Sequence, residues 1–446
     1  MWRRWIAGVA ACAMLLPMSG CSFVNLDMEK QLRAPHAAGE QSAIQTALEE
    51  HIFALNAEQE QGTAVSYVLK YPRMGDYRSA FIMKDMNGDG KEEALAFYAM
   101  QPEGANSHIA LLRKIDGVWQ CTDDIEGLAT EVERIHFGDL DGNGTAEIFA
   151  GYSMYNTRDR RLMLYSWEND VLTECYSDTY SHMLVGHMTA RSHDDLLLFR
   201  LNNTDKKTSV KLLSLENGEV VTKGETALDG NILSFQDYQF AQLDDDIRGV
   251  YQDCTKDSNT TITELILWDG ETLSAPLYDA TENITSRSAR ESGLPFKDID
   301  GDKIIEWPIS LRLPGDESKS VDMISLWLTE WYTWDVFMNR PEKKQTSIVN
   351  VNDDYQLTIP EEWVGRVTAT YDVKKRKLSV LRVVEEGENE ELFHIVAFPE
   401  REKNPLGDDY VFLKLDGQMR YEMKLQPSAD SDLKVETVRT LFSIYK

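Results

Sequence analysis

The sequence has few cysteines and no CxxC pair. Of its five cysteines, Cys12 and Cys21 lie near the start of the 446-residue chain, which leaves Cys121, Cys175 and Cys254. An odd remainder without paired spacing argues against a disulfide framework and against a cysteine-based metal site. We therefore expect these three side chains to be buried as small apolar groups.

The common catalytic motifs are also missing. The sequence has no GxSxG, no HExxH, no P-loop and no GxGxxG. Its eight histidines are scattered. We expect His136 to be a hydrogen-bonded strand residue and His187 and His193 to lie in a surface loop. The prediction is a protein that is not an enzyme. The alternative is an enzyme that cleaves extracellular glycan through paired carboxylates.

Positive charge is scarce. Lysine and arginine number 46 against 75 aspartates and glutamates, which gives a net charge of −29. Such a surface repels phosphates, so we expect no nucleic acid partner and no attraction to anionic lipid headgroups. Charged and hydrophobic residues make up 27% and 42% of the chain, as in a globular protein, and the length allows two domains.

The first twenty residues predict an export signal. Two arginines precede an apolar core over residues 6–16, which is too short to span a bilayer comfortably. The segment Met18-Ser19-Gly20 before Cys21 resembles a bacterial lipobox, which implies cleavage after residues 1–20 and lipidation of the Cys21 sulfur. The alternatives are an ordinary secretory signal and an uncleaved helix. We expect an extracytoplasmic lipoprotein, anchored to a bacterial membrane through Cys21 and a tether over 21–41.

Apolar residues recur at helical spacing after the tether, and they predict one amphipathic helix over residues 42–63 that packs on the following domain. These residues are Ile44, Ala47, Leu48, Ile52 and Leu55.

Three nonapeptides, which begin at Asp85, Asp139 and Asp298, share one spacing of oxygen-bearing side chains. Side chains at positions 1, 3, 5 and 9 and the carbonyl at position 7 can surround Ca²⁺, which takes six or more oxygen ligands. Glycine at position 6 suits a sharp turn, whereas the third copy has Lys303 there. The predicted calcium ligands are Asp85, Asn87, Asp89, Lys91 and Glu93; Asp139, Asp141, Asn143, Thr145 and Glu147; and Asp298, Asp300, Asp302, Ile304 and Glu306.

These loops are not EF-hands, because position 12 holds Ala96, Ala150 and Ile309 in place of glutamate. Apolar, aromatic-rich runs follow the first two loops and predict a strand–loop–strand arrangement. The alternative is an acidic β-turn that binds nothing, since Asp-Gly and Asn-Gly are common turn dipeptides.

The loops repeat with a period near 54 residues, the interval between residues 85 and 139. Two degenerate copies are expected before residue 298, one over 186–196 without ion ligands and a shortened one that begins at Ala241. Tight turns within most copies indicate hairpins, so each unit predicts four strands, as in a propeller blade. The turns are Asp116-Gly117, Asn169-Asp170, Asn217-Gly218 and Asp269-Gly270. The last repeat, from Met323 to Phe337, shows no such turn.

This unit resembles the FG-GAP/VCBS repeat family, whose members are calcium-bearing propeller blades. The resemblance covers residues 64–345. It implies a mainly β chain with a β-propeller of four-stranded blades, about five of which are detected, and it implies that positions 1, 3, 5 and 9 hold structural calcium. A parallel β-solenoid is the alternative, but its repeats are much shorter.

Residues 346–446 predict a small α+β domain, with strands followed by a helical pattern from Leu433 to Ile444. Its opening, with Ile359-Pro360 and Trp363-Val364-Gly365, loosely resembles PsbP-like extracytoplasmic domains. Just before this domain, three tryptophans predict core packing or, alternatively, a shallow ligand site. They are Trp327, Trp331 and Trp334.

The expected function is non-catalytic: binding, adhesion or envelope assembly by a calcium-containing lipoprotein outside the membrane. Its ligand, whether protein or carbohydrate, is not specified by these patterns.

Overall fold

The chain is mainly β-strand, with two α-helices, in the parts that the computed structural model describes. These are residues 38–58, 66–100, 105–154, 160–168, 171–291, 293–314, 323–385, 388–401, 407, 409–427 and 433–445. The expected signal peptide, Cys21 and residues up to 37 of the tether lie outside them. Over these ranges no helix combines the length and apolar character that a membrane span requires.

Four antiparallel sheets follow one another along the chain, each with its strands paired in sequence order. The first contains β2 (Phe81–Lys84), β3 (Glu93–Met100), β4 (Ser107–Ile115) and β5 (Val118–Glu126), with β1 (Tyr67–Leu69) added to β3. The second contains β6 (Glu131–Gly138), β7 (Glu147–Ser153), β8 (Arg160–Glu168) and β9 (Val171–Tyr180). The third contains β10 (His182–Gly186), β11 (Asp195–Asn202), β12 (Lys207–Glu216) and β13 (Glu219–Leu228). The fourth contains β14 (Ser234–Gln242), β15 (Arg248–Thr255), β16 (Thr261–Trp268) and β17 (Leu273–Ser274).

The four-strand repeat predicted from the period is therefore confirmed for these sheets. Three of the expected turns lie between third and fourth strands, and the turn at residues 269–270 is one of them. In the other two, Asp116 and Asn217 have φ of 49° and 52° and the following glycines have φ of 83° and 81°. Two successive residues in the left-handed region are the geometry of a tight hairpin turn. The expected turn at residues 169–170 lies outside the described residues.

A fifth sheet has the order β20-β22-β23-β24-β30. Its strands are β20 (Trp307–Arg312), β22 (Trp327–Asp335), β23 (Arg340–Asn350), β24 (Tyr355–Thr358) and β30 (Phe442–Ile444). The expectation that this repeat lacks a turn is wrong, because the chain reverses between β22 and β23. That turn escaped detection because it lacks glycine and uses Asn339 at φ 50° instead.

The sixth sheet has the order β21-β25-β26-β27-β29-β28. Its strands are β21 (Met323–Ser325), β25 (Val367–Asp372), β26 (Lys377–Arg382), β27 (Glu390–Pro399), β28 (Val411–Asp416) and β29 (Met419–Leu425). Helix α3 (Val435–Leu441) and the short 3₁₀ helix Glu361–Trp363 accompany it, and a separate hairpin of β18 (Tyr278–Asp279) and β19 (Ile284–Thr285) precedes β20.

The last two sheets exchange strands, which corrects the expected boundary between residues 345 and 346. That boundary falls inside β23, and β24 and β30 from beyond it complete the fifth sheet. Conversely, β21 precedes the boundary but pairs with β25 of the sixth sheet. The cause is tertiary: the edge of β24 needs a hydrogen-bonding partner, and the last strand of the chain supplies it.

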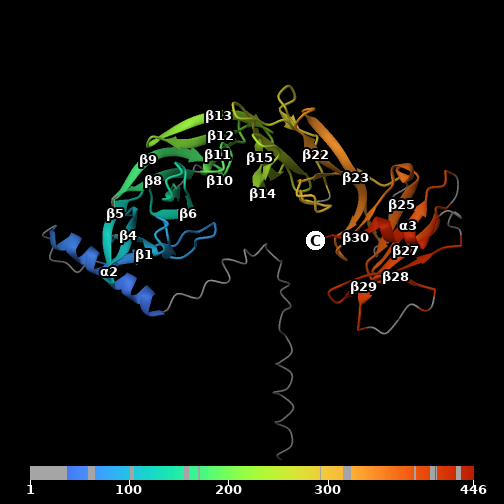
Figure 1. Ribbon diagram of the computed structural model, residues 1–446, viewed down its shortest axis with the longest axis horizontal. Helices are drawn as coiled ribbons and strands as arrows, with labels where there is room; N and C mark the ends of the chain where they lie inside the picture. Colours follow the sequence, from blue (N-terminus) through green and yellow to red (C-terminus); the bar gives the residue numbers. More distant parts are fainter. Residues whose placement is uncertain are drawn as a thin grey trace, which may run out of the picture.

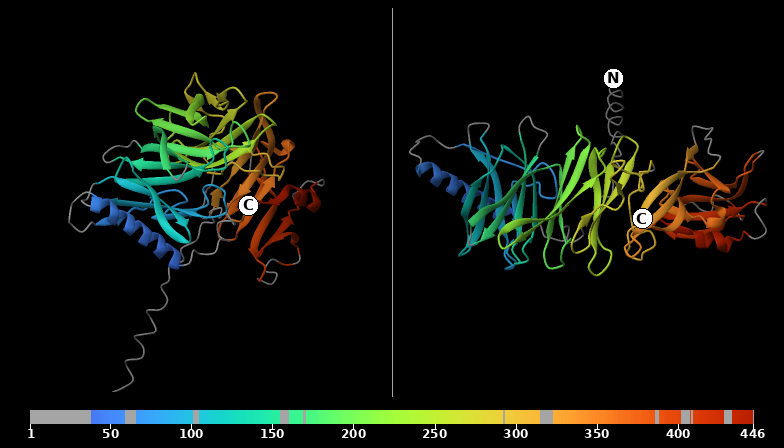
Figure 2. Two further views of the ribbon diagram at one scale, coloured as in Figure 1. Left: turned by 60° about the vertical axis from the view of Figure 1, so that its left-hand side comes forward. Right: turned by 90° about the horizontal axis from the view of Figure 1, so that it is seen from above.

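The sheets stack along an arc, with the first sheet and the sixth at its two ends (Figures 1 and 2). Each pair of neighbouring sheets shares a hydrophobic core. Interior sheets are therefore buried on both faces, which explains why a second strand such as β7 is apolar without alternation.

Helix α2 (Ala38–Glu58) covers the outer face of the first sheet. Ile44, Leu48 and Ile52 are buried against that sheet. The helix begins before the expected start at residue 42, and residues 59–63 of the expected range lie outside the described residues.

Candidate metal sites in the acidic loops

The three acidic loops occupy equivalent positions in the first, second and fifth sheets. The first loop (residues 85–93) joins β2 to β3, and the second (residues 139–147) joins β6 to β7. The third (residues 298–306) leads into β20, and a bridge between Lys297 and Glu306 takes the place of the first strand pair. Position 9 is thus always the first residue of a strand or directly precedes one.

Backbone N–H groups fold each loop around its first carboxylate. In the second loop, Gly142 N donates to Asp139 Oδ1 at 2.8 Å and Gly144 N donates to Asp139 Oδ2 at 2.9 Å. The third loop repeats both bonds on Asp298. The first loop repeats one of them, from Gly90 N to Asp85 Oδ2.

Position 5 is held by position 7 in all three loops. Lys91 N donates to Asp89 Oδ1, Thr145 N to Asn143 Oδ1 and Ile304 N to Asp302 Oδ1, at 2.6–2.8 Å. Position 5 N–H donates in turn to the side chain of position 3, which is Asn87, Asp141 or Asp300. Every predicted ligand side chain is therefore oriented by its own loop.

Lys303 does not disrupt the third loop. It adopts φ of 71°, where the first two loops have Gly90 and Gly144 at 83° and 87°. The left-handed conformation is costly for a residue other than glycine, but the third loop keeps the hydrogen bonds seen in the second loop. Lysine at position 6 therefore does not prevent the third loop from adopting the conformation of the other two.

The carboxylate at position 9 is buried in every loop, with Glu93 and Glu147 2% exposed and Glu306 0% exposed. Each accepts a hydrogen bond from the N–H at position 2. Burial, followed by repulsion from the neighbouring aspartates, raises the pKa of Glu147 and Glu306 to about 7 and raises the pKa of Glu93. A carboxylate kept in this environment is stabilised if a cation lies beside it.

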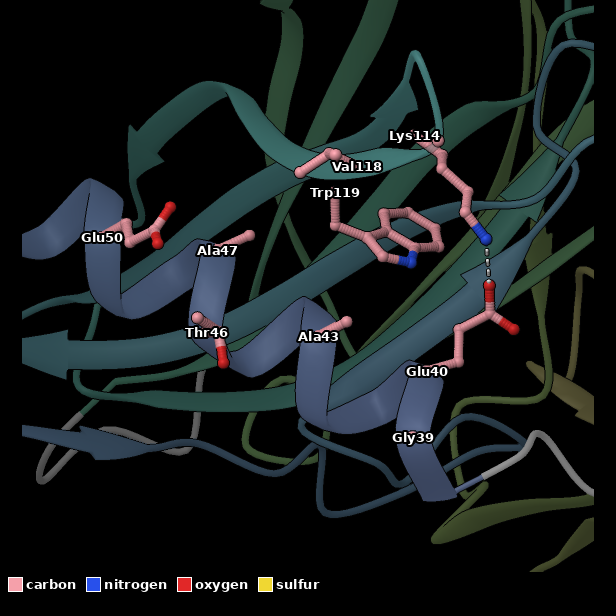
Figure 3. A pocket seen from close by; sticks show the side chains of 10 residues that line it. Gly39, Glu40, Ala43, Thr46, Ala47, Glu50, Lys114, Val118 and Trp119 are labelled. Atoms are coloured by element: carbon pink, nitrogen blue, oxygen red, sulfur yellow. Dashed lines mark hydrogen bonds and ion pairs between the residues drawn. The ribbon is translucent and has the colours of Figure 1, made fainter.

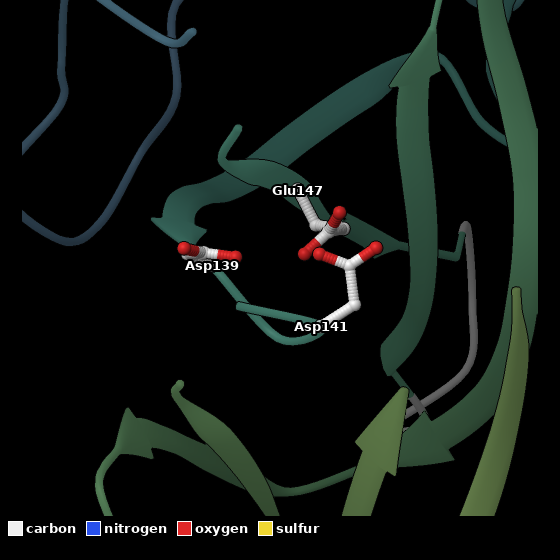
Figure 4. A group of neighbouring side chains, drawn as sticks. All are labelled: Asp139, Asp141 and Glu147. Atoms are coloured by element: carbon white, nitrogen blue, oxygen red, sulfur yellow. The ribbon is translucent and has the colours of Figure 1, made fainter. Parts of the chain in front are cut away.

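Two of the loops gather three carboxylates whose oxygens lie within 4.8 Å of one another: Asp139, Asp141 and Glu147 (Figure 4), and Asp298, Asp300 and Glu306. These clusters could hold a metal ion. The side-chain donors are all oxygens, which suits Ca²⁺ better than zinc or copper. Two buried oxygens in these loops, Asp85 Oδ1 and Glu306 Oε1, have no hydrogen-bond partner within the protein, as expected of atoms that face an ion.

In the degenerate loop at residues 187–195, hydrogen bonds from the protein satisfy the buried carboxylate. Asp195, which is 0% exposed, takes the place of the position 9 glutamate and accepts Met188 N at 3.0 Å. Its oxygens also accept bonds from Thr189 N, Thr189 Oγ1 and Ser214 Oγ. Neighbouring donors therefore compensate this carboxylate. In the shortened copy, Leu243 N bonds directly to Ile247 O and closes a tight turn.

Neighbouring loops also touch, which no sequence pattern predicted. Ala146 N of the second loop donates to Met86 O of the first at 2.7 Å, and Asp194 N of the degenerate loop donates to Asp139 O at 2.7 Å. Asp139 N donates back to Asp194 Oδ2 at 3.1 Å. The loops of the first three sheets therefore form one continuous edge.

Sequence reasoning also missed two histidine networks. His51 of α2 and His108 of β4 both bond to Asp124 of β5, at 2.9 and 3.2 Å. In the sixth sheet, His394 Nε2 lies 2.8 Å from the Tyr410 hydroxyl and its Nδ1 contacts Glu391. Asp124 lies 73 residues from His51 and 16 from His108, and Tyr410 lies 16 from His394, so no sequence spacing indicated these contacts. Glu391 lies three residues before His394. Both networks join elements of the fold.

The other expectations about single residues have mixed outcomes. Trp331 and Trp334 are buried, at 0% and 6% exposure, so they pack in the core, while Trp327 is half-buried under Arg312. Cys254 is buried, but Cys121 and Cys175 are only half-buried, which corrects the expectation for those two; all three are free thiols.

A groove of about 580 Å³ lies between α2 and the β4–β5 hairpin (Figure 3). Small residues on α2, such as Ala43 and Ala47, leave this space above Trp119. Glu40 Oε1 and Lys114 Nζ close one end with an ion pair of 3.0 Å. Its charged lining residues are Glu40, Glu50 and Lys114.

Comparison with known proteins gives only distant likenesses. No family model matches the chain, and no curated protein matches it. Among solved structures, an exotype rhamnogalacturonan lyase, YesX, has 11% identity and a TM-score of 0.29 over 70% of this chain. This chain covers 63% of that lyase, less than two thirds of its length.

Two further structures are similar at the same level. A rhamnogalacturonan lyase, PL11, of Bacillus licheniformis has 11% identity and a TM-score of 0.29, over 74% of this chain and 72% of that one. The periplasmic gluconolactonase PpgL of Pseudomonas aeruginosa has 11% identity and a TM-score of 0.27, over 71% and 85%. Scores this low carry no argument about activity, so what the chain does must be inferred from its own residues.

Proposed function

We propose that this protein is a lipoprotein of the bacterial envelope that displays a calcium-stabilised, FG-GAP/VCBS-like propeller arc as a non-catalytic binding module. Cys21 anchors it outside the membrane. The five similar sheets form the binding scaffold, and the sixth sheet with α3 closes the chain. The arrangement of sheets in Figure 1 supports a rigid scaffold, because neighbouring sheets share hydrophobic cores.

The observation that carries the proposal is the repeated geometry of the acidic loops. Three loops far apart in sequence orient carboxylate and amide oxygens through the same backbone hydrogen bonds. Each also buries a glutamate, and the partnerless Oε1 of Glu306 marks a place for a cation. The degenerate loop also buries a carboxylate, that of Asp195, but there hydrogen bonds from the protein satisfy its oxygens.

Calcium would be held by the predicted ligands of each loop and would supply charge neutralisation. Each bound ion would stabilise the fold, because an ion that binds only the folded state stabilises that state by about 2.7 kcal/mol per site when the Ca²⁺ concentration is a hundred times the Kd. The protein groups do the rest: they fix the turn and exclude water from the position 9 glutamate.

Melting temperatures of the full chain in detergent micelles test the proposed calcium sites. They are measured with excess Ca²⁺, with excess Mg²⁺ and with chelator. We expect a saturable rise that Ca²⁺ produces more strongly than Mg²⁺, since Mg²⁺ sheds its waters reluctantly and fits such cages poorly. A variant with Asp85, Asp139 and Asp298 changed to Asn should lose most of this rise. Equal melting temperatures in Ca²⁺ and in chelator would refute the proposal that the loops bind calcium.

The anchor and the absence of catalysis are tested separately. Growth of the producing cells with a palmitate analogue should label the wild type and leave Cys21→Ser unlabelled. Turnover of polysaccharide or peptide by the purified chain, abolished by a single substitution, would replace the binding role with the enzyme alternative. A large apolar surface on the sixth sheet that captures an envelope protein would favour an assembly role.

A further inference from the structure

The hairpin between β22 and β23 ends in two adjacent apolar side chains that are exposed. Phe337 is 84% exposed, the largest fraction among the large hydrophobic residues of the described chain, and Met338 is 66% exposed. Asp335 Oδ1 accepts hydrogen bonds from the N–H groups of both residues, at 3.0 Å each, and Asn339 completes the turn with φ of 50°. The turn thus holds the tip in one conformation, so the tip loses little conformational freedom when it binds another apolar surface.

An apolar groove of about 540 Å³ lies in the sixth sheet, where the 3₁₀ helix, α3 and the ends of β25, β26 and β27 meet. Val367 and Leu392 are its buried residues, at 5% and 6% exposure. Pro360, Trp363 and Leu433 are half-buried, so part of each remains accessible. The volume lies within the range of about 300–1,000 Å³ that suits a drug-sized molecule, which leaves room for two large side chains.

Unpaired charges accompany both features. At the groove, Glu362 and Arg366 are exposed, and neither side chain has an ion pair or hydrogen bond among the described residues. On the hairpin, Arg340 and Glu342 are exposed and equally without a partner in the described ranges. Each feature therefore offers one free charge of each sign, so the two are complementary in charge as well as in apolar character.

The groove adjoins the base of the same hairpin. Lys343 Nζ of β23 lies 3.0 Å from Glu361 Oε2, and Glu361 begins the 3₁₀ helix that contributes Trp363 to the groove. From Lys343 to the tip the chain extends by at most about 17 Å, at about 3.3 Å per residue. Tip and groove thus lie near each other on one molecule, so a single two-fold axis between two copies can place each tip in the other copy's groove.

We propose that this protein forms a two-fold dimer in which the β22–β23 tip of each copy occupies the groove of the other. Phe337 and Met338 pack against Trp363, and Glu342 of one copy pairs with Arg366 of its partner. Phenylalanine, methionine, tryptophan and arginine are the residue types that interface cores favour. Two hairpin tips cover less surface than the about 1,200–2,000 Å² of stable complexes, so we expect a Kd of about 10 µM to 1 mM. This dimer goes beyond the proposed function and depends on neither calcium nor the lipid anchor.

Photo-crosslinking of the full chain in excess detergent micelles tests the contact. The photoreactive analogue p-benzoylphenylalanine replaces Phe337, and ¹⁵N-labelled chains are mixed with unlabelled ones, so that a cross-link between a labelled and an unlabelled peptide joins two molecules. We expect such cross-links from position 337 to residues 360–367 or 433–437, which line the groove. The same analogue in place of Phe53, which is 75% exposed on α2, is the matched control and should give none to these residues.

Charge variants test the docking geometry without disturbing the core, because the substituted side chains are exposed. Arg366→Glu places like charges together and should lower the yield of cross-links by at least about tenfold. Adding Glu342→Arg in the same chain restores opposite charges and should return the yield to within about twofold of the original. The melting temperature of each variant in Ca²⁺ should stay within the wild-type range.

The contrary results are distinct. Cross-links from position 337 that join no second chain, that reach only detergent, or that map outside the groove would overturn the dimer. A double variant that does not recover would overturn the pairing of Glu342 with Arg366 and the docking geometry built on it. None of these results alters the dependence of the melting temperature on calcium, so the calcium-binding module is judged separately.

Discussion

Calcium sites in the first and second loops should be energetically coupled. Glu93 of the first loop holds Met86 N at 3.1 Å, and the carbonyl of Met86 accepts Ala146 N at 2.7 Å. Ala146 directly precedes Glu147, which closes the second loop. An ion that fixes Glu93 therefore also orders the peptide before Glu147, so removal of the first site through Asp85→Ala should weaken the second.

The size of this coupling follows from the connecting bond. One backbone hydrogen bond contributes about 0.5–1.5 kcal/mol net, which corresponds to a change of about two- to tenfold in affinity. By linkage, deletion of the second site through Asp139→Ala must weaken the first by the same factor. No hydrogen bond described here joins the third loop to either of them, so the affinity of the third loop should stay constant.

Calorimetric titration with Ca²⁺ measures these factors. The double variant Asp85→Ala/Asp298→Ala retains only the second site, and Asp298→Ala retains the first two. We expect the second site to bind two- to tenfold more tightly when the first is filled. The variant Asp85→Ala/Asp139→Ala isolates the third site as a control for general destabilisation.

Equal affinity of the second site in both backgrounds would refute the coupling. A parallel loss of affinity at the third site would show that the substitutions act through the stability of the whole chain, and the hydrogen-bond argument would fail.

Three further results are expected. Glu306→Gln should reduce the rise in melting temperature with Ca²⁺ yet raise the melting temperature in chelator, because it removes a buried carboxylate whose Oε1 has no partner within the protein; a lower value in chelator would contradict this. Lys303→Gly should increase the free energy of unfolding in urea by about 1 kcal/mol, since it relieves a left-handed residue at φ 71°; no gain would mean that the loop relaxes around lysine. Burial acts to raise the pKa of Asp124, but hydrogen bonds from His108, His51 and Tyr98 outweigh it and lower the pKa from 3.8 to about 2. The stabilisation of about 2 kcal/mol is thus present above pH 3.8 and lost as the pH falls through about 2. Asp124→Asn should therefore cost this amount at pH 6 in urea unfolding and little at pH 2, and a constant difference would contradict it.

The repeat unit could be predicted because its signals are local. An acidic loop, an apolar run and a tight turn recur within 54 residues, and each depends on neighbours a few positions away. The strands around Asp139, for example, follow from the apolar residues that flank it. The four-stranded antiparallel sheets were predicted correctly for this reason.

The exchange of strands between the last two sheets could not be predicted. β30 pairs with β24 across more than eighty residues, and β21 pairs with β25 after skipping β22 to β24. Such pairings depend on which strands still have an unpaired edge once the other strands of the sheets have paired. No residue pattern near residue 345 indicates these strand pairings.

The sequence alone thus determined where oxygen ligands stand within each loop, since a turn of nine residues sets their spacing. It also indicated that the apolar runs after the first two loops are strands. Only the tertiary structure decided that two of the loops touch through Met86 and Ala146, and that Trp363, Leu392 and Leu433 share one groove. The physical reason is that contacts between sheets depend on how whole layers stack, and that arrangement is set by the sum of many apolar contacts, which no short stretch of the chain contains.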